Sequence, residues 1–300
     1  MHDLYTLTDL GSRQLLDSGY PRPARLAVIG FPIAHSASPR MHQPALDEAG
    51  IDARYVKIAI EPGNVAETFR RMRALGFVGC NVTVPHKLEA MAACDELDPG
   101  AVAMGAVNTI RFDAGATRGF NTDGPGFEAA IRESFQTGLQ ELTVMIVGAG
   151  GGAGGALAAH CASRGVAKLV LANRTVEKIQ PLAANLRSLH GLPVECFSLS
   201  DPALVAATAE CLLLVNASSL GLKPGDASPL DPAGMNAKHL LYDTIYQPPL
   251  TEFLRAGARA GARLANGASM LLHQGANAFQ IWFPGTEPLA AMRKGLGVTA

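Results

Sequence analysis

The sequence predicts an α/β protein with two domains, the second of them a doubly wound sheet. A length of 300 residues is typical of two domains. Short apolar runs that suit buried strands alternate with helical stretches along most of the chain. Near the middle, residues 142–155 read LTVMIVGAGGGAGG, an apolar strand that runs into a glycine-rich turn. Together these observations favour parallel strands joined by helical crossovers.

Composition narrows the class of protein. Hydrophobic residues make up 48% of the chain and charged residues 17%, so a sizeable core can be buried. The 25 basic and 26 acidic side chains leave no basic excess that would indicate nucleic-acid binding. The N-terminal residues lack a signal-peptide pattern, and the five cysteines show no CxxC pair and no ligand spacing with histidine. We therefore expect a cytoplasmic protein with reduced core cysteines and no metal site.

One stretch could be mistaken for a membrane segment. Residues 142–159 are uncharged and about long enough to span a bilayer. They consist mostly of glycine and alanine, however, and six glycines would make a poor isolated helix. The sequence therefore predicts no contact with a membrane.

The first half of the chain alternates between strands and helices from Arg25 onward. Helices are expected at about 39–50 and 62–75, and Pro44 should make the first of them irregular. Residues 1–24 indicate one helix and a proline-rich lead-in, to which we assign no function. The predicted strands are Leu26–Gly30, Arg54–Ile60, Val78–Thr83, Val107–Phe112 and Thr117–Asn121.

The second half repeats this rhythm after a helix expected at Phe127–Phe135. Further helices should lie near 175–190, 201–209 and 249–260. The predicted strands are Leu142–Val147, Leu169–Ala172, Val194–Phe197, Leu212–Asn216, Leu240–Asp243 and Arg263–Ala265. Six strands with helical crossovers match a doubly wound sheet, to which the closing helix Ser269–Trp282 does not easily belong.

The glycine turn is typical of a dinucleotide-binding site. A strand, a tight turn and a helix bring backbone N–H groups and a helix N-terminus against a pyrophosphate. Two registers fit, Gly148-x-Gly150-x-x-Ala153 and Gly150-x-Gly152-x-x-Gly155. We prefer the first because it follows the strand at once. Small residues that merely pack a helix against a strand are the alternative explanation.

The residues after the next strand bear on the choice of cofactor. That strand ends at Asn173-Arg174-Thr175, and Lys178 follows one turn later. In an NAD site an acidic residue near this point holds the ribose 2′-hydroxyl. Arg174 can instead grip a 2′-phosphate with its planar fork of donors, and Thr175 offers a hydroxyl at a helix start. This pattern favours NADP, although a surface arginine beside an N-cap threonine would look the same.

Two polar turns at strand ends are candidates for the chemistry. Lys87 begins a helix just after Pro85 ends a strand, and a lysine there opposes the helix dipole. Asp123 lies in the turn GFNTDG at 119–124, where it could also simply begin the next helix. We expect His86 to be a surface or packing histidine with no role.

A third polar turn suits an anionic group. Ser36 and Ser38 lie two residues apart, and Ser38 before Pro39 is expected to be a helix N-cap. A helix N-terminus with two hydroxyls is a natural carboxylate site. Asn108 adds an amide near another strand edge.

At this point the sequence resembles the shikimate dehydrogenase family from about Ala24 to Trp282. Any one of the shared motifs would be weak evidence, but eight in order are highly specific. They are HSASP, GCNVTVPHK, GAVNT, NTDG, the glycine loop with NRT, NASSLG at 216–221, YDTIYQP at 242–248 and GASMLLHQGANAFQIW at 267–282. The chain departs from the family in its extra loop glycines, in Pro99 and in residues 1–24.

The resemblance implies NADP-dependent interconversion of 3-dehydroshikimate and shikimate. It implies that Lys87 and Asp123 are the catalytic pair and that Ser36 and Ser38 take the substrate carboxylate. The implied contacts to substrate hydroxyls are Thr83, Asn108, Asp123, Tyr246 and Gln274. The implied cofactor-binding residues are Gly148, Ala149, Gly150, Gly151, Gly152, Asn173, Arg174, Thr175 and Lys178, with Thr244 and Gly267 near the nicotinamide.

The implied chemistry agrees with the residue types. Hydride delivery to a ketone creates an alkoxide, which a charged Lys87 can stabilise and protonate while Asp123 orients the lysine. Gln274 lies on the same helical face as apolar residues, so a buried amide there needs partners such as a polyol substrate or the backbone.

The resemblance also implies the domain layout. Residues 1–123 plus 267–300 would form a discontinuous α/β substrate domain and residues 124–266 a Rossmann-type NADP domain, with the active site in the cleft between them. We expect a small-molecule enzyme that is a monomer or homodimer. A quinate/shikimate dehydrogenase or another paralogue acting on a carboxylated cyclohexane polyol is the nearest alternative. A non-catalytic NADP-binding sensor is a second, disfavoured because Lys87 and Asp123 are both present.

Overall fold

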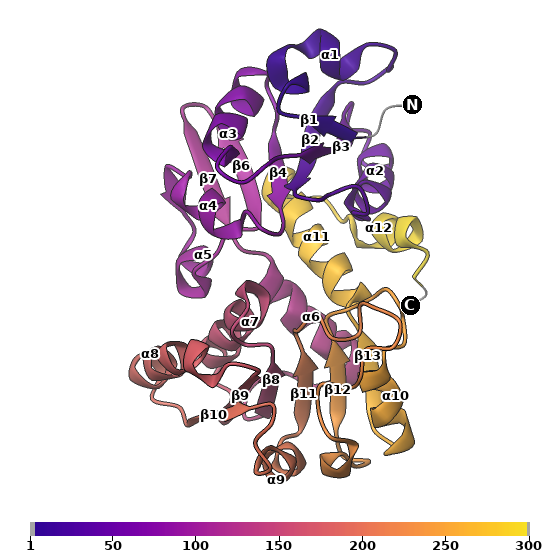
Figure 1. The fold of residues 1–300 in the computed structure, drawn as a ribbon. Helices are drawn as coiled ribbons and strands as arrows, with labels where there is room; N and C mark the ends of the chain where they lie inside the picture. The colour runs from indigo at the N-terminus through magenta and orange to yellow at the C-terminus, as the bar shows by residue number, and fades with distance from the viewer. Residues whose placement is uncertain (1–3, 299–300) are drawn as a thin grey trace. The chain divides into compact units, whose positions relative to one another are not determined.

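The computed structural model describes residues 4–298, which fold into two α/β units (Figure 1). The first unit extends through Thr122 and resumes at Leu272, and the second comprises Asp123–Leu271. Residues 1–3 and 299–300, which the expected domain ranges include, lie outside the described part. No helix within residues 4–298 is long and apolar enough to traverse a bilayer.

The first unit is built on a seven-stranded sheet with the strand order β1-β3-β2-β4-β6-β7-β5. The strands are β1 Leu4–Thr6, β2 Ala24–Gly30, β3 Arg54–Ala59, β4 Gly79–Val82, β5 Glu96–Leu97, β6 Thr109–Asp113 and β7 Ala116–Phe120. Strands β1, β3, β2 and β4 are parallel, whereas β6 runs antiparallel to both β4 and β7. The parallel strands therefore end at one edge, where the polar turns predicted from sequence begin.

Short helices connect these strands. They are the 3-10 turn η1 Asp9–Gly11 and the helices α1 Arg13–Asp17, α2 Ser38–Glu48, α3 Val65–Ala74, α4 Lys87–Ala92 and α5 Pro99–Met104. The closing helices are α11 Ala268–Trp282, which begins in the second unit, and α12 Leu289–Leu296. Pro44 lies inside α2, as its position in the sequence predicts.

The N-terminal segment contains the helix that the sequence predicts, α1, together with a strand that was not predicted. Residues 4–6 form strand β1, which adds to the sheet in parallel beside β3. Three residues are too few to show the alternation that identifies a strand. Strand β5, helix α5 and helix α12 are likewise absent from the predicted elements, and the first two are similarly short.

The second unit is a six-stranded parallel sheet with the order β10-β9-β8-β11-β12-β13. Its strands are β8 Thr143–Val147, β9 Lys168–Asn173, β10 Val194–Ser198, β11 Leu213–Asn216, β12 Leu240–Asp243 and β13 Arg263–Asn266. The chain starts at β8, moves outward to β10, and returns to β11 on the other side of β8. The order reverses between β8 and β11, where doubly wound sheets bind their ligands.

Helices cover both faces of this sheet (Figure 1). They are α6 Asp123–Phe135, α7 Gly152–Ser163, α8 Gln180–His190, α9 Leu204–Glu210 and α10 Glu252–Arg259, with the 3-10 turns η2 Val176–Lys178 and η3 Pro232–Gly234. Strand β8 is buried on both sides: Val144 and Ile146 belong to one apolar cluster, and Met145 and Val147 to another. Such two-sided burial explains the continuous apolar run in the sequence.

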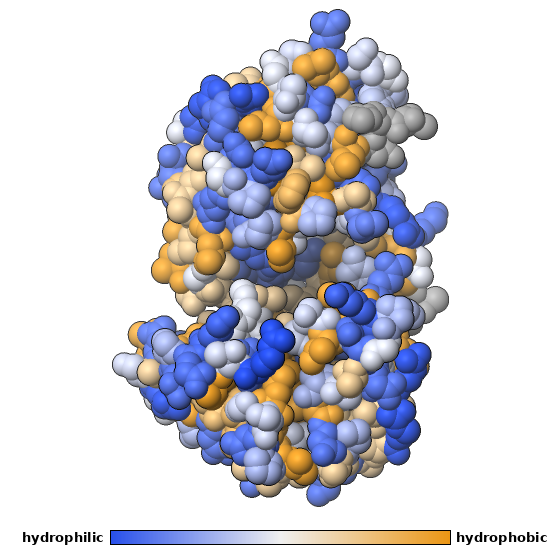
Figure 2. All heavy atoms as spheres, viewed as in Figure 1, coloured by the Kyte–Doolittle hydropathy of each residue, from blue (hydrophilic) through white to orange (hydrophobic). Residues whose placement is uncertain are grey.

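The surface of each unit mixes apolar and polar residues. Figure 2 shows apolar residues scattered among hydrophilic ones over both units. Scattered apolar residues of this kind are normal for a protein surface.

The C-terminal part of α11 is tied to the first sheet by one buried hydrogen bond. The indole N–H of Trp282 donates to the backbone oxygen of Ile110 at 2.8 Å, and the ring leaves no room for a side chain at Gly79. We expect Trp282→Phe to lower the free energy of unfolding by about 1–3 kcal/mol, because a buried carbonyl loses its donor. Urea unfolding measures this change. It is followed by circular dichroism rather than by tryptophan fluorescence, because the substitution removes the only tryptophan. An unchanged midpoint would contradict the assignment.

Candidate active site

The glycine turn after β8 is shaped by backbone contacts that only glycine permits. Gly148 adopts a φ of +82°, and its N–H donates to the backbone oxygen of Ala172 at 2.8 Å. A Cβ on Gly154 would lie 2.4 Å from the backbone oxygen of Gly148, so α7 presses directly against the end of β8. Helix α7 begins at Gly152 with Gly151 as its N-cap. The turn therefore presents an uncovered helix N-terminus, the geometry that receives a pyrophosphate.

The structure distributes the glycine roles in a way that neither predicted register describes. Gly148 makes the tight turn, and Gly150 faces Asn173, whose amide nitrogen would lie 2.7 Å from a Cβ there. Close packing of the helix on the strand falls to Gly154, whereas the two registers placed Ala153 or Gly155 in that position. A Cβ on Gly152 would meet nothing within 4 Å. Which of these glycines contact the pyrophosphate stays a prediction.

The segment after β9 leaves two cations exposed next to this turn. The amide nitrogen of Asn173 donates to the backbone oxygen of Thr175 at 2.8 Å, which fixes the bend that follows the strand. Thr175 precedes η2 but its hydroxyl makes no capping bond. Arg174 and Lys178 are both exposed, and neither has an ion pair with a carboxylate among residues 4–298. Two exposed cations next to the glycine turn are suited to bind a further phosphate group of a dinucleotide.

The loops after β11, β12 and β13 reach the same edge of the sheet. A Cβ on Gly148 would strike Ser218 at 2.8 Å, which brings the loop after β11 against the glycine turn. A Cβ on Gly267 would lie 2.0 Å from the backbone oxygen of Thr244. The residues predicted from sequence to lie near the nicotinamide, Thr244 and Gly267, are thus in backbone contact with each other.

A buried carboxylate that the sequence-based reasoning missed holds these loops. The Asp243 oxygens accept hydrogen bonds from the Asn216 amide at 3.1 Å, the Ile245 N–H at 3.0 Å and the Thr251 hydroxyl at 2.6 Å. Burial raises the pKa of Asp243, and the three donors lower it in part. Asn216 also bonds the loop that follows β11, through Ser218. Asn216 and Asp243 are the polar residues that end the apolar strands β11 and β12. Their position is the sequence signal that could have identified them.

In the first unit, the two serines predicted to bind a carboxylate lie together. The Ser36 hydroxyl donates to the Ser38 hydroxyl at 3.2 Å, and the Ser38 N–H donates back to Ser36 at 3.3 Å. Helix α2 begins at Ser38 itself, with Ala37 at the N-cap, so the expected capping role of Ser38 is wrong. The Ser38 hydroxyl instead accepts a hydrogen bond from Ser36.

The turn after β4 places Thr83 and Lys87 half-buried at the same edge of the first sheet as the serines. A Cβ on Gly30, at the end of β2, would touch the Thr83 methyl group at 2.7 Å, so the loops after β2 and β4 are in contact. Lys87 is the first residue of α4, as its sequence context predicts. His86 is fully buried, and its Nε2 bonds the backbone oxygen of Ile60 at 2.7 Å. This histidine is therefore a packing residue rather than a surface one.

Asn108 is buried just before β6 and has a fixed amide. Its oxygen accepts hydrogen bonds from the Thr122 N–H at 2.8 Å and the Thr109 hydroxyl at 3.0 Å. Its nitrogen donates to the Thr122 hydroxyl at 3.0 Å. Asn108 is therefore tied to the residue that immediately precedes Asp123.

The remaining predicted residues are all half-buried. Asp123 is the first residue of α6, and Tyr246 follows β12; both belong to the second unit. Gln274 lies on α11 in the first unit, one residue before Gly275, whose missing side chain leaves room for Met41. The predicted catalytic pair is thus divided, with Lys87 in the first unit and Asp123 at the start of the second.

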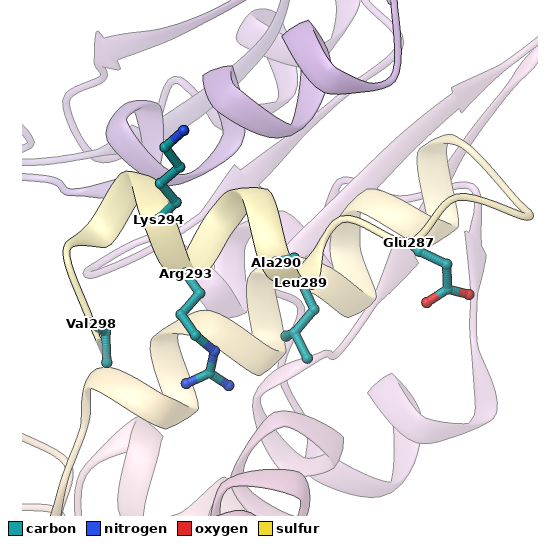
Figure 3. Close-up of a pocket in the computed structure, with 6 residues that line it drawn as sticks. All are labelled: Glu287, Leu289, Ala290, Arg293, Lys294 and Val298. Atoms are coloured by element: carbon teal, nitrogen blue, oxygen red, sulfur yellow. The ribbon is translucent and has the colours of Figure 1, made fainter. Parts of the chain in front are cut away.

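A surface pocket lies apart from all of these residues. It is lined by Glu287, Leu289, Ala290, Arg293, Lys294 and Val298, on and around α12. Figure 3 shows Arg293 and Lys294 extending in opposite directions from that helix. The pocket contains no residue predicted from the sequence to act in binding or catalysis.

Comparisons with known proteins agree with this geometry. Residues 28–110 match the shikimate dehydrogenase substrate binding domain, and residues 130–219 match the family described as shikimate / quinate 5-dehydrogenase. A shikimate dehydrogenase (NADP(+)) of Methanopyrus kandleri is 38% identical over 271 residues, which cover 90% of this chain and 93% of that protein.

Two solved structures are informative. Shikimate 5-dehydrogenase from Thermus thermophilus, in complex with NADP(H) and shikimate, is similar with a TM-score of 0.79 and 33% identity, covering 91% of this chain and 98% of that one. Quinate dehydrogenase from Corynebacterium glutamicum, in complex with NAD, has a TM-score of 0.81 at 28% identity and covers 90% and 97%.

The sheet order, the glycine turn and the separate polar unit define a two-domain dehydrogenase of the dinucleotide-binding class. Within that class the family can be assigned, because each curated relative matches nearly the whole of its own length and of this chain. The chain belongs to the shikimate dehydrogenase family. The resemblance inferred from the eight sequence motifs is thereby confirmed.

Arg174 provides a test of the cofactor preference. We expect Arg174→Ala to weaken NADP binding by roughly 1.5–3 kcal/mol, the range for a hydrogen bond to a charged group, and to leave NAD binding almost unchanged. The reason is that the guanidinium has a partner only on the phosphorylated ribose. Titration of both cofactors by fluorescence or calorimetry measures the difference. Equal losses for the two cofactors would refute the role of Arg174.

Proposed function

We propose that this protein is an NADP-dependent shikimate dehydrogenase, which interconverts 3-dehydroshikimate and shikimate in the cytoplasm as a monomer or homodimer. The observation that carries the proposal is that the two units offer different kinds of binding surface. One has a glycine cradle with exposed Arg174 and Lys178, and the other has a polar edge with Ser36, Ser38, Thr83 and Asn108. The five unpaired cysteines suit a reducing compartment.

The second unit fits NADP. A Cβ at Gly152 would meet nothing within 4 Å, so the start of α7 leaves its backbone open to a pyrophosphate, and the exposed cations after β9 suit the 2′-phosphate. The nicotinamide supplies the hydride when the cofactor is bound. Thr244 and Gly267, in backbone contact, are proposed to lie beside it.

The protein side chains are proposed to handle the proton and the orientation of the substrate. Reduction of a ketone leaves negative charge on its oxygen, which Lys87 stabilises and to which it transfers a proton from Nζ. Asp123 orients the lysine and accepts a hydrogen bond from a substrate hydroxyl. Thr83, Asn108, Tyr246 and Gln274 bind the other hydroxyls, and Ser36 and Ser38 hold the carboxylate.

A turnover assay with shikimate and quinate, each with NADP and NAD, tests the proposal. Turnover of shikimate with NADP well above the other three combinations supports it. Preference for quinate would make the protein a quinate/shikimate dehydrogenase of the same family. Absence of turnover in all four would leave only nucleotide binding and would overturn the enzymatic assignment.

The serine pair should act on binding rather than on chemistry. We expect Ser36→Ala and Ser38→Ala each to raise the Michaelis constant for shikimate more than it lowers kcat, because a carboxylate distant from the reacting carbon is held alike in ground and transition states. Steady-state kinetics at saturating NADP measures the split. If both variants kept the wild-type Michaelis constant, the carboxylate would have to bind elsewhere.

Lys87 and Asp123 should act on turnover. We expect Lys87→Ala to lower kcat by at least about a hundredfold, the low end for a positioned acid–base group, with a much smaller change in substrate binding. Asp123→Asn should impair turnover and binding together, since that carboxylate also contacts a hydroxyl. Both are measured at substrate saturation, with cofactor affinity as the control for folding. A Lys87→Ala enzyme with most of its turnover would remove the lysine from the mechanism.

A further inference from the structure

We propose that His86 and Glu89 are positioning residues, which fix the first turn of α4 and with it the backbone of Lys87. The inference rests on the proposed function, in which Lys87 supplies the proton. Neither His86 nor Glu89 is assigned a contact with the substrate or the cofactor. Both act by bonding the segment that joins β3 to the start of α3.

Helix α4 depends on outside contacts for its position. It spans only the six residues Lys87–Ala92, whereas isolated helices shorter than about 12–15 residues are marginal in water. Its N-cap residue, His86, makes no side-chain capping bond, and the charge of Lys87 at the first position opposes the helix dipole. The helix that carries the proposed proton donor must therefore be held by its neighbours.

Glu89 joins α4 to the start of α3. Its two carboxylate oxygens accept hydrogen bonds from the Val65 N–H at 2.9 Å and the Gly63 N–H at 3.1 Å. Val65 is the first residue of α3, and Asn64 at the N-cap of that helix makes no side-chain capping bond. A carboxylate from α4 thus satisfies the exposed donors at the N-terminus of α3, where negative charge is favourable.

His86 bonds the other end of the same segment. Its Nε2 lies 2.7 Å from the backbone oxygen of Ile60, and a carbonyl can only accept, so Nε2 carries the proton and donates it. The imidazole is fully buried, and its Nδ1 lies 3.6 Å from a Glu89 carboxylate oxygen. Replacement of the ring by an apolar group would leave the oxygen of Ile60, itself a fully buried residue, without this donor.

Lys87 lies between these two residues in the sequence and shares their turn. A third contact comes from the opposite direction, because the Lys87 backbone oxygen accepts a hydrogen bond from the Val107 N–H at 3.2 Å. Val107 directly precedes Asn108, which is proposed to bind a substrate hydroxyl. The backbone of the lysine is thus placed relative to that residue. Misplacement on the order of 1 Å can cost about a hundredfold in rate, so loss of these bonds should reach the chemistry.

The first test is Glu89→Ala, which removes both acceptors and leaves a residue that favours helix. We expect kcat with shikimate and NADP to fall about tenfold, whereas the Michaelis constant for shikimate and the dissociation constant of NADP change less than about twofold. This is the direction of change expected for Lys87→Ala, at smaller size. If Glu89→Ala does not fold, Glu89→Gln, which keeps one acceptor, should show the same split.

Asp9→Ala is the matched control. The Asp9 carboxylate also accepts two hydrogen bonds in the first unit, from the N–H and the hydroxyl of Thr6, both at 2.8 Å. Asp9→Ala should lower the midpoint of urea unfolding without a change in kcat. An equal fall in kcat in this control, or an unchanged kcat in the Glu89 variants, would overturn the inference.

Two substitutions of His86 separate its hydrogen bond from its packing. Glutamine can place an amide N–H near the position of Nε2, whereas leucine fills space without a donor. We expect His86→Gln to keep kcat within about threefold of the wild type and His86→Leu to lower it about tenfold, again with little change in the Michaelis constant. Equal effects of the two substitutions would contradict a role for the bond to Ile60.

Combination with Lys87→Ala shows whether Glu89 acts through the lysine. In the Lys87→Ala enzyme, Glu89→Ala should lower kcat little further, because the group that it positions is already absent. Multiplied losses in the double variant would overturn the inference. Failure of the wild-type protein to turn over shikimate with NADP would instead overturn the proposed function on which the inference rests.

Discussion

The contact between the start of α7 and the end of β8 is the constraint on which the second unit depends. Because Gly154 lies against the backbone oxygen of Gly148, the helix N-terminus is brought as close to the strand end as a backbone permits. The same principle recurs where Gly267 meets Thr244. This edge is therefore made of backbone surfaces, and side chains enter mainly at its rim, with Arg174 and Lys178. Such an edge lets a phosphorylated ligand approach the backbone closely.

The first unit differs from the second, because its edge is built from buried polar side chains rather than from backbone. Each of these groups would lose several kcal/mol on leaving water if it were unpaired. Tyr55 and Asn81 avoid that loss by bonding each other, and Thr109 bonds both Asn81 and Asn108. A satisfied network of this kind specifies one arrangement of donors. Substrate discrimination in a set of similar polyols depends on such a fixed arrangement.

Much of the architecture could be predicted from sequence because the deciding signals are local. The buried strands of the second unit are continuous apolar runs, and glycine is required at Gly154 and Gly267, where a Cβ would strike the backbone. The family motifs then supplied the site residues that spacing alone could not. What escaped prediction depends on contacts between distant residues. Strand β1 is defined only by its neighbour β3, and the partners of Asn81, Tyr55 and Thr109, lie on other strands.

Strand β1 has a practical consequence. It covers the outer edge of β3, and the segment behind it is anchored by Arg54, whose guanidinium donates to the Leu16 backbone oxygen at 2.6 Å and stacks over Tyr20 at 3.7 Å. The family match begins only at residue 28. A shortened polypeptide that started there would lack this cover and leave the N–H and C=O groups of β3 open. Open edges pair with other molecules, so a fragment cut to the family boundary is expected to aggregate during expression.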